Sequence, residues 1–196
     1  KKKKKKIKTQ PIKGTSSRFD NLSQDELSKN SLLNSEKDFS ENVMIVDLVR
    51  NDLSITAASG SVYVDELAKL YSYKNVHHLI STVVSEIAEN INPIDVIKNA
   101  FPMGSMTGAP KLRSMELIED YEKSYRGIYS GSIGYFTPEM DFDFNVVIRS
   151  LLYNQKSNYL SFMVGGAITI ESDAKSEYHE CLVKAKSILD ILNDEK

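Results

Sequence analysis

The chain has 196 residues, of which 41% are hydrophobic and 27% are charged, and its formal net charge at pH 7 is −2. This composition is typical of a globular protein, and the chain lacks the run of about 18 uncharged apolar residues that a membrane-spanning helix needs. The single cysteine, Cys181, excludes an internal disulfide framework and favours a reducing compartment, so we expect a cytoplasmic location and no membrane partner.

The first residues are strongly basic, because Lys1–Lys6 carry six positive charges and leave about −8 on the rest of the chain. No apolar stretch follows them, as it would in a secretory signal. We interpret residues 1–10 as a disordered or truncated N-terminal segment. The acidic remainder argues against nucleic acid as a partner, so DNA binding through the lysines is the weakest functional alternative.

Residues 7–35 are polar and rich in turn residues, and they predict a short extended segment and a loop before the first helix. Apolar residues at helical spacing predict a small helix over 25–32 and an amphipathic helix over 36–52. A short strand and turn are predicted over 61–70. A further helix is predicted over 77–89, and the following proline, Pro93, ends this region.

The second half of the chain changes its periodicity. A helix is predicted over 110–122, with a proline in its first position. Three strand-like runs follow, over 126–136, 143–153 and 159–170, and turn residues separate them. A closing helix is predicted over 174–192. Helices, then antiparallel strands, then one last helix predict an α+β fold with an antiparallel sheet flanked by helices.

Two pairs of carboxylates have a spacing that suits a metal. Asp38 and Glu41 are three residues apart on one predicted helix, and Glu177 and Glu180 are three apart on another. This spacing places both members of a pair on one face of the helix. If the two faces oppose each other, they form an oxygen-rich site suited to Mg²⁺. The alternative is two solvated acidic faces, which are common in chains of this composition.

Two glycine-containing segments offer backbone groups to an anion. The loop over 104–109 precedes a predicted helix, whose first N–H groups have no partner within the helix. Gly165 and Gly166 lie in a predicted strand, where glycines favour close approach of a ligand. A turn or a bulge explains each segment equally well, and neither has the spacing of a nucleotide-binding motif.

Basic side chains supply the remaining candidates. Lys13, between Ile12 and Gly14, is a nucleophile if it is shielded from water, although most lysines are surface charges. Arg149 lies in a predicted apolar strand, where we expect a carboxylate partner from the protein or from a bound acid. His77 and His78 are adjacent, and the choice between a core role and proton transfer stays open for each.

Several long strings in this sequence resemble those of chorismate-utilising enzymes, a family that includes the anthranilate, aminodeoxychorismate, isochorismate and salicylate synthases. They agree in order and spacing from about Pro11 to the end of the chain. The strings are Val43–Leu53, His78–Val83, Phe101–Lys111, Arg126–Tyr135, Val164–Ile168 and Ser172–Glu180. The resemblance implies that residues 11–196 are the C-terminal portion of a chorismate-binding domain whose N-terminal half, with a further active-site carboxylate, is absent.

The resemblance also implies a magnesium site and a substrate site. Glu41 and Glu180 match the Mg²⁺ ligands of the family, with Asp38 and Glu177 in support, and the metal would bridge to the ring carboxylate of chorismate. The residues that match substrate-binding positions are Thr107, Gly108, Tyr129, Arg149, Gly165, Gly166, Ala167 and Lys184.

Individual roles follow from the same resemblance. The backbone of residues 165–167 would receive the ring carboxylate, and Thr107 would line the ring. Tyr129 and Arg149 would hold the enolpyruvyl carboxylate. His78 matches a histidine near the reacting C4 region of the substrate, which makes it a catalytic candidate.

Lys13 distinguishes the members of the family. Anthranilate synthases typically have alanine at this position, whereas a lysine resembles aminodeoxychorismate synthase component I. The implied mechanism is attack of the lysine on C2 of chorismate with loss of the C4 hydroxyl, followed by addition of ammonia at C4 and release of the lysine. The implied pathway is 4-aminobenzoate and folate synthesis, with ammonia supplied by a separate glutamine amidotransferase subunit.

Besides the absent N-terminal half, the sequence departs from the family pattern at a few positions. Asp38 stands where glutamate is usual, Ala167 replaces a glycine, and 16–18 read Ser-Ser-Arg in place of Arg-Pro-Arg. The alternatives are anthranilate synthase component I, an isochorismate or salicylate synthase, and a non-catalytic truncated fragment whose acidic helices bind a partner.

Overall fold

The computed structural model describes residues 1–193 except 75 and 171. The chain forms two compact units. The first unit comprises Lys1–Asp120 and Gly134–Asp143, and the second comprises Tyr121–Ile133 and Phe144–Lys196.

The main sheet of the chain is antiparallel and is built around one long strand, β5. The strands are β1 (Lys2–Lys3), β2 (Lys6–Thr9), β3 (Ile12–Ser17), β4 (Tyr63–Ser72), β5 (Val76–Glu86), β6 (Ser132–Phe136) and β7 (Phe142–Val146). Over the described residues they form a seven-stranded sheet in the order β3-β5-β2-β1-β7-β6, with β4 also paired to β5. One edge of β5 pairs with β3 and then β2, and the other edge pairs with β4.

The prediction of a helix over 77–89 is wrong, because this segment forms β5. Val83 and Val84 are neighbours with side chains on opposite faces, yet they are only 0% and 1% exposed. A strand that is buried on both faces has no alternation of polar and apolar residues, which is the usual signature of a strand. The β-branched residues Ile80, Thr82, Val83 and Val84 nevertheless favour an extended backbone.

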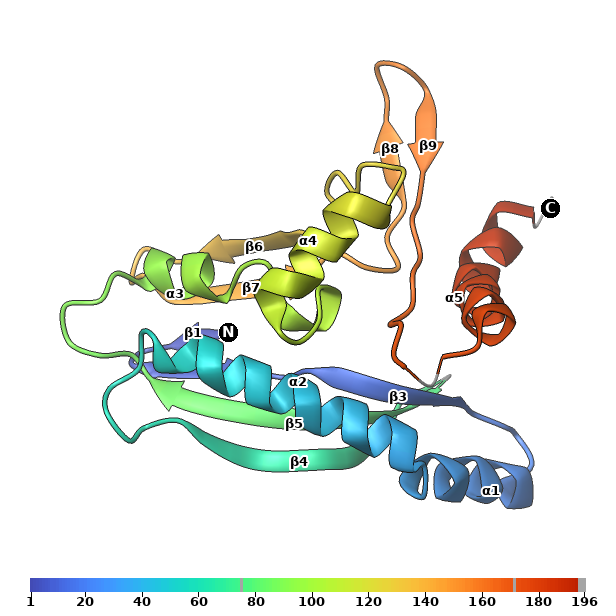
Figure 1. Cartoon of the computed structure of the whole chain (residues 1–196), viewed down its shortest axis with the longest axis horizontal. Coiled ribbons are helices and arrows are strands. Elements are labelled where there is room, and N and C mark those ends of the chain that lie inside the picture. Colours follow the sequence, from blue (N-terminus) through green and yellow to red (C-terminus); the bar gives the residue numbers. More distant parts are fainter. Residues whose placement is uncertain (75, 171, 194–196) are drawn as a thin grey trace. The chain divides into compact units, whose positions relative to one another are not determined.

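The two helices predicted in the first part of the chain are present. They are α1 (Leu22–Leu33), capped by the side chain of Asn21, and α2 (Glu36–Ser54), capped by Ser35. Helix α2 crosses β3, β5 and β4 (Figure 1) and buries Ile45, Val46 and Leu53. Burial of each large apolar side chain contributes about 1.5–3 kcal/mol to folding.

Two further helices complete the first unit. Helix α3 (Pro93–Ala100) was not predicted, although Asn92 caps it and Pro93 occupies its first turn, both of which are helix start signals. A short 3-10 turn, η1 (Gly104–Met106), leads to the predicted helix α4 (Lys111–Tyr121).

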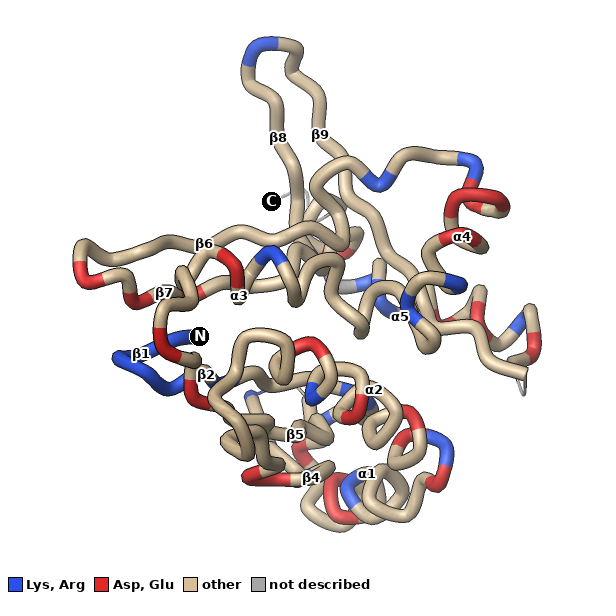
Figure 2. The backbone as a smooth tube through the Cα atoms, turned by 60° about the vertical axis from the view of Figure 1, so that its left-hand side comes forward, with Lys and Arg blue, Asp and Glu red and all other residues tan. Residues whose placement is uncertain are grey.

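Residues 1–10 are ordered in β1 and β2, in contrast to the disordered segment expected from their charge. Lys2 is only 7% exposed, and its Nζ donates to the Met140 carbonyl and to Asp141, each at 3.0 Å. Lys1 Nζ lies 2.8 Å from Asp143. Figure 2 shows the basic (blue) stretch at β1 near the acidic (red) stretch at β7. Acidic partners far away in the sequence thus pair with Lys1 and Lys2 next to the first strand of the sheet.

The second unit contains a hairpin and a long helix. The hairpin joins β8 (Leu152–Asn154) and β9 (Tyr159–Ser161), and the helix is α5 (Ala174–Asn193), close to its predicted bounds. The strands predicted over 143–153 and 159–170 are shorter than expected, because the chain leaves regular pairing at 147–151 and again after Ser161.

The antiparallel sheet and the helices that accompany it confirm the predicted α+β class. None of the helices in the described part of the chain is long and apolar enough to cross a membrane.

Candidate functional site

In the first unit, the candidate nucleophile faces a candidate metal ligand. Lys13 Nζ, from β3, lies 3.5 Å from Glu41 Oε2, from α2, and each side chain is only 16% exposed. Lys37 Nζ approaches the other oxygen of Glu41 at 4.0 Å. The structure therefore holds a primary amine and a carboxylate together in a position shielded from water.

The backbone around Lys13 is fixed against α2 by Gly14. Gly14 has a φ of +87°, in the left-handed region that favours glycine. A Cβ at this position would lie 3.1 Å from Asp38 Cβ and from Leu32 Cδ1. Asp38, the second predicted acidic residue of α2, therefore packs directly against the residue that follows the lysine.

The two adjacent histidines have different environments. His77 is fully buried, with Nε2 2.9 Å from Asp25 Oδ1 and Nδ1 2.8 Å from Ser72 Oγ, so it fills the core role. His78 is 9% exposed, and its Nδ1 lies 2.9 Å from Thr15 Oγ1. Since Thr15 and His78 are paired in register, His78 lies across from the strand segment that carries Lys13.

The environment of Asp25 keeps this carboxyl ionised. Burial opposes ionisation, but hydrogen bonds from the Phe19 N–H at 3.1 Å, from His77 and from Arg18 Nε at 2.9 Å outweigh it. Together they hold the pKa of Asp25 well below its usual range. This cluster attaches α1 to β5 and so supports the strand that presents His78.

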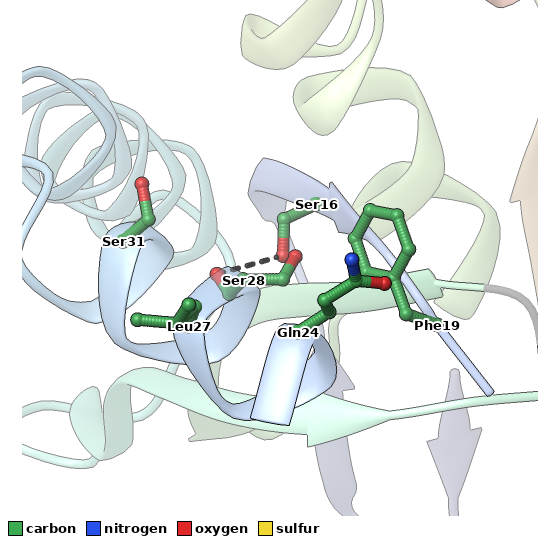
Figure 3. Close-up of a pocket in the computed structure, with 6 residues that line it drawn as sticks. All are labelled: Ser16, Phe19, Gln24, Leu27, Ser28 and Ser31. Carbon is green, nitrogen blue, oxygen red and sulfur yellow. Dashed lines mark hydrogen bonds between the residues drawn. The ribbon is translucent and has the colours of Figure 1, made fainter. Parts of the chain in front are cut away.

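A shallow groove lies between α1 and the end of β3 (Figure 3). Its lining residues are Ser16, Phe19, Gln24, Leu27, Ser28 and Ser31. Ser16 Oγ donates to the Ser28 carbonyl across its floor at 3.2 Å. None of the predicted site residues lines this groove, so it is separate from the candidate site.

The predicted ring-lining residue Thr107 also lies in the first unit. Its Oγ1 donates to the carbonyl oxygens of Met103 at 3.3 Å and Gly104 at 3.5 Å, which holds the side chain against η1. Gly108 follows, and a Cβ there would lie 2.6 Å from Ser114 Oγ. Both residues are therefore held in a compact loop before α4.

In the second unit, several predicted substrate-binding residues come together at Gly165. Lys184 Nζ donates to the Gly165 carbonyl at 2.9 Å and pairs with Glu180 Oε1 at 2.5 Å. A Cβ on Gly165 would lie 2.9 Å from Tyr129 Oη. Burial raises the pKa of Tyr129 above its usual value, so its hydroxyl stays protonated as a hydrogen-bond donor.

The neighbouring Gly166 faces the second acidic pair. A Cβ on Gly166 would lie 3.3 Å from Glu177 Oε2 and 3.8 Å from Glu180 Oε1. Glu177 is 7% exposed, and its other oxygen accepts a hydrogen bond from Ser172 Oγ at 2.7 Å. The missing side chain of Gly166 thus leaves room beside two carboxylates. Ala167 follows in the same segment, which is irregular rather than the strand predicted over 159–170.

Arg149 is not in a strand, contrary to the prediction. It lies at a bend after β7, with a φ of +51° and an exposed side chain. A carboxylate partner was expected because a buried arginine needs one, but the Arg149 side chain is exposed. Its role in holding a substrate carboxylate stays a prediction.

The acidic residues fit a magnesium ion by their chemistry. The first unit supplies Asp38 and Glu41, and the second supplies Glu177 and Glu180. Within the described part of either unit, no three acidic, histidine or cysteine side chains gather in a metal-binding cluster. Mg²⁺ commonly uses one or two carboxylates and completes its shell with water and an anionic ligand, so each pair offers a suitable donor set. The room beside Gly166 agrees with this use.

Two buried polar residues of α2 were not among the predicted site residues. Asn42 is fully buried and donates to the carbonyl oxygens of Lys13 and Leu79. Asp52 is 7% exposed and pairs with Lys111. The available signal was their position in an amphipathic helix next to apolar core residues, where polar side chains need partners.

The chain is similar to known proteins over most of its length. A family model described as chorismate binding enzyme matches residues 1–190. The chain is 48% identical over 182 residues to the probable chloroplastic aminodeoxychorismate synthase of Oryza sativa subsp. japonica, covering 92% of this chain and 20% of that protein. It is 43% identical over 185 residues to aminodeoxychorismate synthase component 1 of Bacillus subtilis (strain 168), covering 94% of this chain and 39% of that protein.

A solved structure shows the same fold. Anthranilate synthase component I from Streptococcus pneumoniae TIGR4 superposes with a TM-score of 0.77 and 32% sequence identity, over 95% of this chain and 40% of that chain. The chain thus spans about a fifth to two fifths of the length of these relatives.

Proposed function

The chain belongs to the family of chorismate-binding enzymes, and we propose that it carries the active-site residues of an aminodeoxychorismate synthase component I. The reaction is amination of chorismate at C4, in 4-aminobenzoate and folate synthesis. Relatives named aminodeoxychorismate synthase, at 48% and 43% identity, support this choice. The single observation that carries it is the shielded Lys13 next to Glu41, because a nucleophilic lysine distinguishes this reaction from the other amination in the family.

Lys13 acts as the nucleophile in the proposed mechanism. Its Nζ, as the neutral amine left after loss of a proton to solvent, forms a bond to C2 of chorismate, the ring double bond shifts, and the bond between C4 and its hydroxyl oxygen breaks. His78 gives a proton to the departing hydroxyl, which leaves as water. Ammonia then forms a bond to C4, the double bond shifts back, and Lys13 is released. A covalent intermediate of this kind divides one difficult substitution into two easier steps.

The other residues bind and orient the substrate. The backbone of residues 165–167, with Lys184, receives the ring carboxylate. Thr107 and Gly108 line the ring, and Tyr129 and Arg149 hold the enolpyruvyl carboxylate. Mg²⁺, held by Glu41 and Glu180, would neutralise the ring carboxylate. Asp38 and Glu177 support those two ligands.

The ammonia comes, in this proposal, from a glutamine amidotransferase subunit. A component I needs such a partner because it does not release ammonia from glutamine itself. The reducing compartment indicated by the single cysteine makes the cytoplasm the proposed location, although two plant relatives are named as chloroplastic.

The test uses the complete polypeptide encoded by the gene, with chorismate, Mg²⁺ and an ammonium salt. Mass spectrometry identifies the product. We expect aminodeoxychorismate, which an added lyase converts to 4-aminobenzoate. Anthranilate as the product would instead support the anthranilate synthase alternative, which similarity to the Streptococcus pneumoniae structure favours.

Substitution of the lysine tests the mechanism. Lys13→Ala should lower C4 amination by about 10²-fold or more, since it removes the covalent route. Lys123→Ala, an exposed lysine after α4, is the matched control and should retain full turnover. Unchanged amination by Lys13→Ala would remove the lysine from the mechanism.

A further inference from the structure

One stripe of α2 relates the lysine site to the Thr107 loop. Glu41, Leu48 and Asp52 are seven and four residues apart, so they lie within about 40° of one another around the helix axis. Glu41 faces Lys13, as described above. Leu48 lies about 10 Å further along the axis, at 1.5 Å per residue. The helix therefore fixes the distance between Lys13 and the residues that contact Leu48 and Asp52.

Leu48 contacts the loop that carries Thr107. A Cβ on Gly104 would lie only 2.3 Å from Leu48 Cδ2 and 2.8 Å from Leu48 Cγ. Any larger residue at Gly104 would therefore push the loop away from α2. The loop packs against the helix at the turn whose carbonyl oxygens hold Thr107.

Asp52 and Lys111 hold the base of the same loop. Lys111 Nζ donates to Asp52 Oδ1 at 2.8 Å and to Oδ2 at 2.7 Å, and it lies 3.5 Å from the Ala100 carbonyl. The two side chains are 8% and 19% exposed, so water and salt screen this pair weakly. Ala100 ends α3 and Lys111 begins α4, so one ammonium group joins both ends of the loop 101–110 to the end of α2.

We propose that Asp52 and Lys111 are a positioning pair that fixes the Thr107 loop on α2 at the separation from Lys13 that the substrate ring requires. The inference rests on the proposed function, because it assigns the loop to chorismate. Neither residue touches the reacting atoms. The pair determines the position of Thr107 and does not affect the positions of Lys13 and Glu41.

The first experiment measures loop order without any substrate. In the complete polypeptide, Asp52→Asn and Lys111→Met remove one charge each, and hydrogen exchange is followed at the amides of Met106 and Thr107. These amides donate to the Met103 and Gly104 carbonyls. We expect their exchange to quicken about tenfold or more, with β5 amides unchanged. Asp47→Asn, which breaks an exposed ion pair with Arg50 on the same helix, is the matched control.

The second experiment measures chorismate kinetics in the same variants. We expect KM to rise about tenfold while kcat changes less than threefold, since the loop positions the ring and the nucleophile is intact. Lys111→Arg keeps the charge and should restore most of the affinity. Asp47→Asn should match the unmodified protein in both KM and kcat.

The outcomes separate the inference from the proposed function. Unchanged loop exchange, or faster exchange with unchanged KM, would overturn the positioning role. Faster hydrogen exchange in the variants of a protein that does not use chorismate would instead overturn the proposed function. The conclusion that Asp52 and Lys111 fix the loop on α2 would then still hold. If a single variant does not fold, the charge-swapped pair Asp52→Lys with Lys111→Asp provides the same test, with KM expected to recover in the swap.

Discussion

The side-chain amide of Asn42 donates to the main-chain carbonyl of Lys13 at 3.5 Å. The same amide donates to the Leu79 carbonyl of β5 at 3.3 Å, and Ser81 Oγ donates to the Asn42 carbonyl oxygen. One fully buried asparagine thus connects α2 to the strand of the candidate nucleophile and to the strand of His78. Buried polar groups in such a network are costly to leave without partners.

Asn42→Ala should destabilise the protein by about 2–4 kcal/mol, because it leaves buried carbonyl and hydroxyl groups unpaired and removes side-chain volume. Urea denaturation of both proteins measures the change in the free energy of unfolding. Asn51→Ala, at an exposed position on the same helix, should change it by less than about 0.5 kcal/mol. Equal losses in the two variants would contradict a special role for the buried amide.

Gly14→Ala should destabilise by about 2 kcal/mol or more, since it combines a left-handed backbone with 3.1 Å contacts to Asp38 and Leu32. Gly60→Ala is a matched control, because Gly60 has a φ of +72° but a Cβ there would meet nothing within 4 Å. It should cost only the backbone strain, about 1–2 kcal/mol. Urea midpoints measure both. A loss in Gly60→Ala as large as in Gly14→Ala would show that close packing against α2 contributes nothing.

Glu66 makes stability depend on pH in the acid range. Its ion pair with Lys69 and the hydrogen bond from Tyr71, both at 2.5 Å, lower the pKa of Glu66 to about 2 from 4.5. The folded state therefore binds fewer protons than the unfolded state between these values. The stabilisation is complete above about pH 4.5 and is lost as the pH falls towards about 2.

Glu66→Gln should flatten this part of the profile of unfolding free energy against pH. Tyr71→Phe should narrow the pH range over which stability is lost. Without the hydrogen bond from Tyr71, the pKa of Glu66 in the folded state is lowered less, so the loss of stability ends at a higher pH. Tyr63→Phe, on the same strand, should leave the profile unchanged. Urea denaturation at several pH values between 2 and 6 provides the measurement, and parallel profiles for Glu66→Gln and the unmodified protein would refute the assignment.

Removal of Mg²⁺ by a chelator should abolish chorismate turnover by the complete polypeptide. Glu180→Gln should raise the Mg²⁺ concentration needed for half-maximal activity by about 10–100-fold, since it removes a proposed ligand. Glu139→Gln, an exposed carboxylate on the β6–β7 turn, is the control and should leave that concentration unchanged. Full turnover in the presence of the chelator would remove the metal from the proposal.

Local patterns predicted much of the fold, and non-local burial explains where they failed. The amphipathic stripe of α2 was sufficient to place that helix within two residues of its observed end. Strand β5 was assigned as a helix because its two buried faces remove the alternation that marks a strand. The lysine run was assigned as disordered because the acidic partners of Lys1 and Lys2 lie in the distant β6–β7 segment.

The candidate site was predicted by resemblance more than by spacing. Spacing along the sequence placed each acidic pair on one helical face but gave no sign that Lys13 faces Glu41, 28 residues away. The pairing of Asp52 with Lys111, 59 residues away, was missed for the same reason. A lone charged residue in a helix shows that it needs a partner but does not identify that partner.

The attachment of Lys2 to Asp141 and Phe142 also determines when the first unit can form during synthesis. Asp141 and Phe142 lie 139 and 140 residues after Lys2 in the sequence. A ribosome working at about 5–20 residues per second therefore needs roughly 7–28 seconds after Lys2 to supply them. Until then, the edge of β1 that pairs with β7 lacks its neighbour and is open to pairing with other chains. The nascent chain is therefore most exposed to aggregation and to chaperones during this interval.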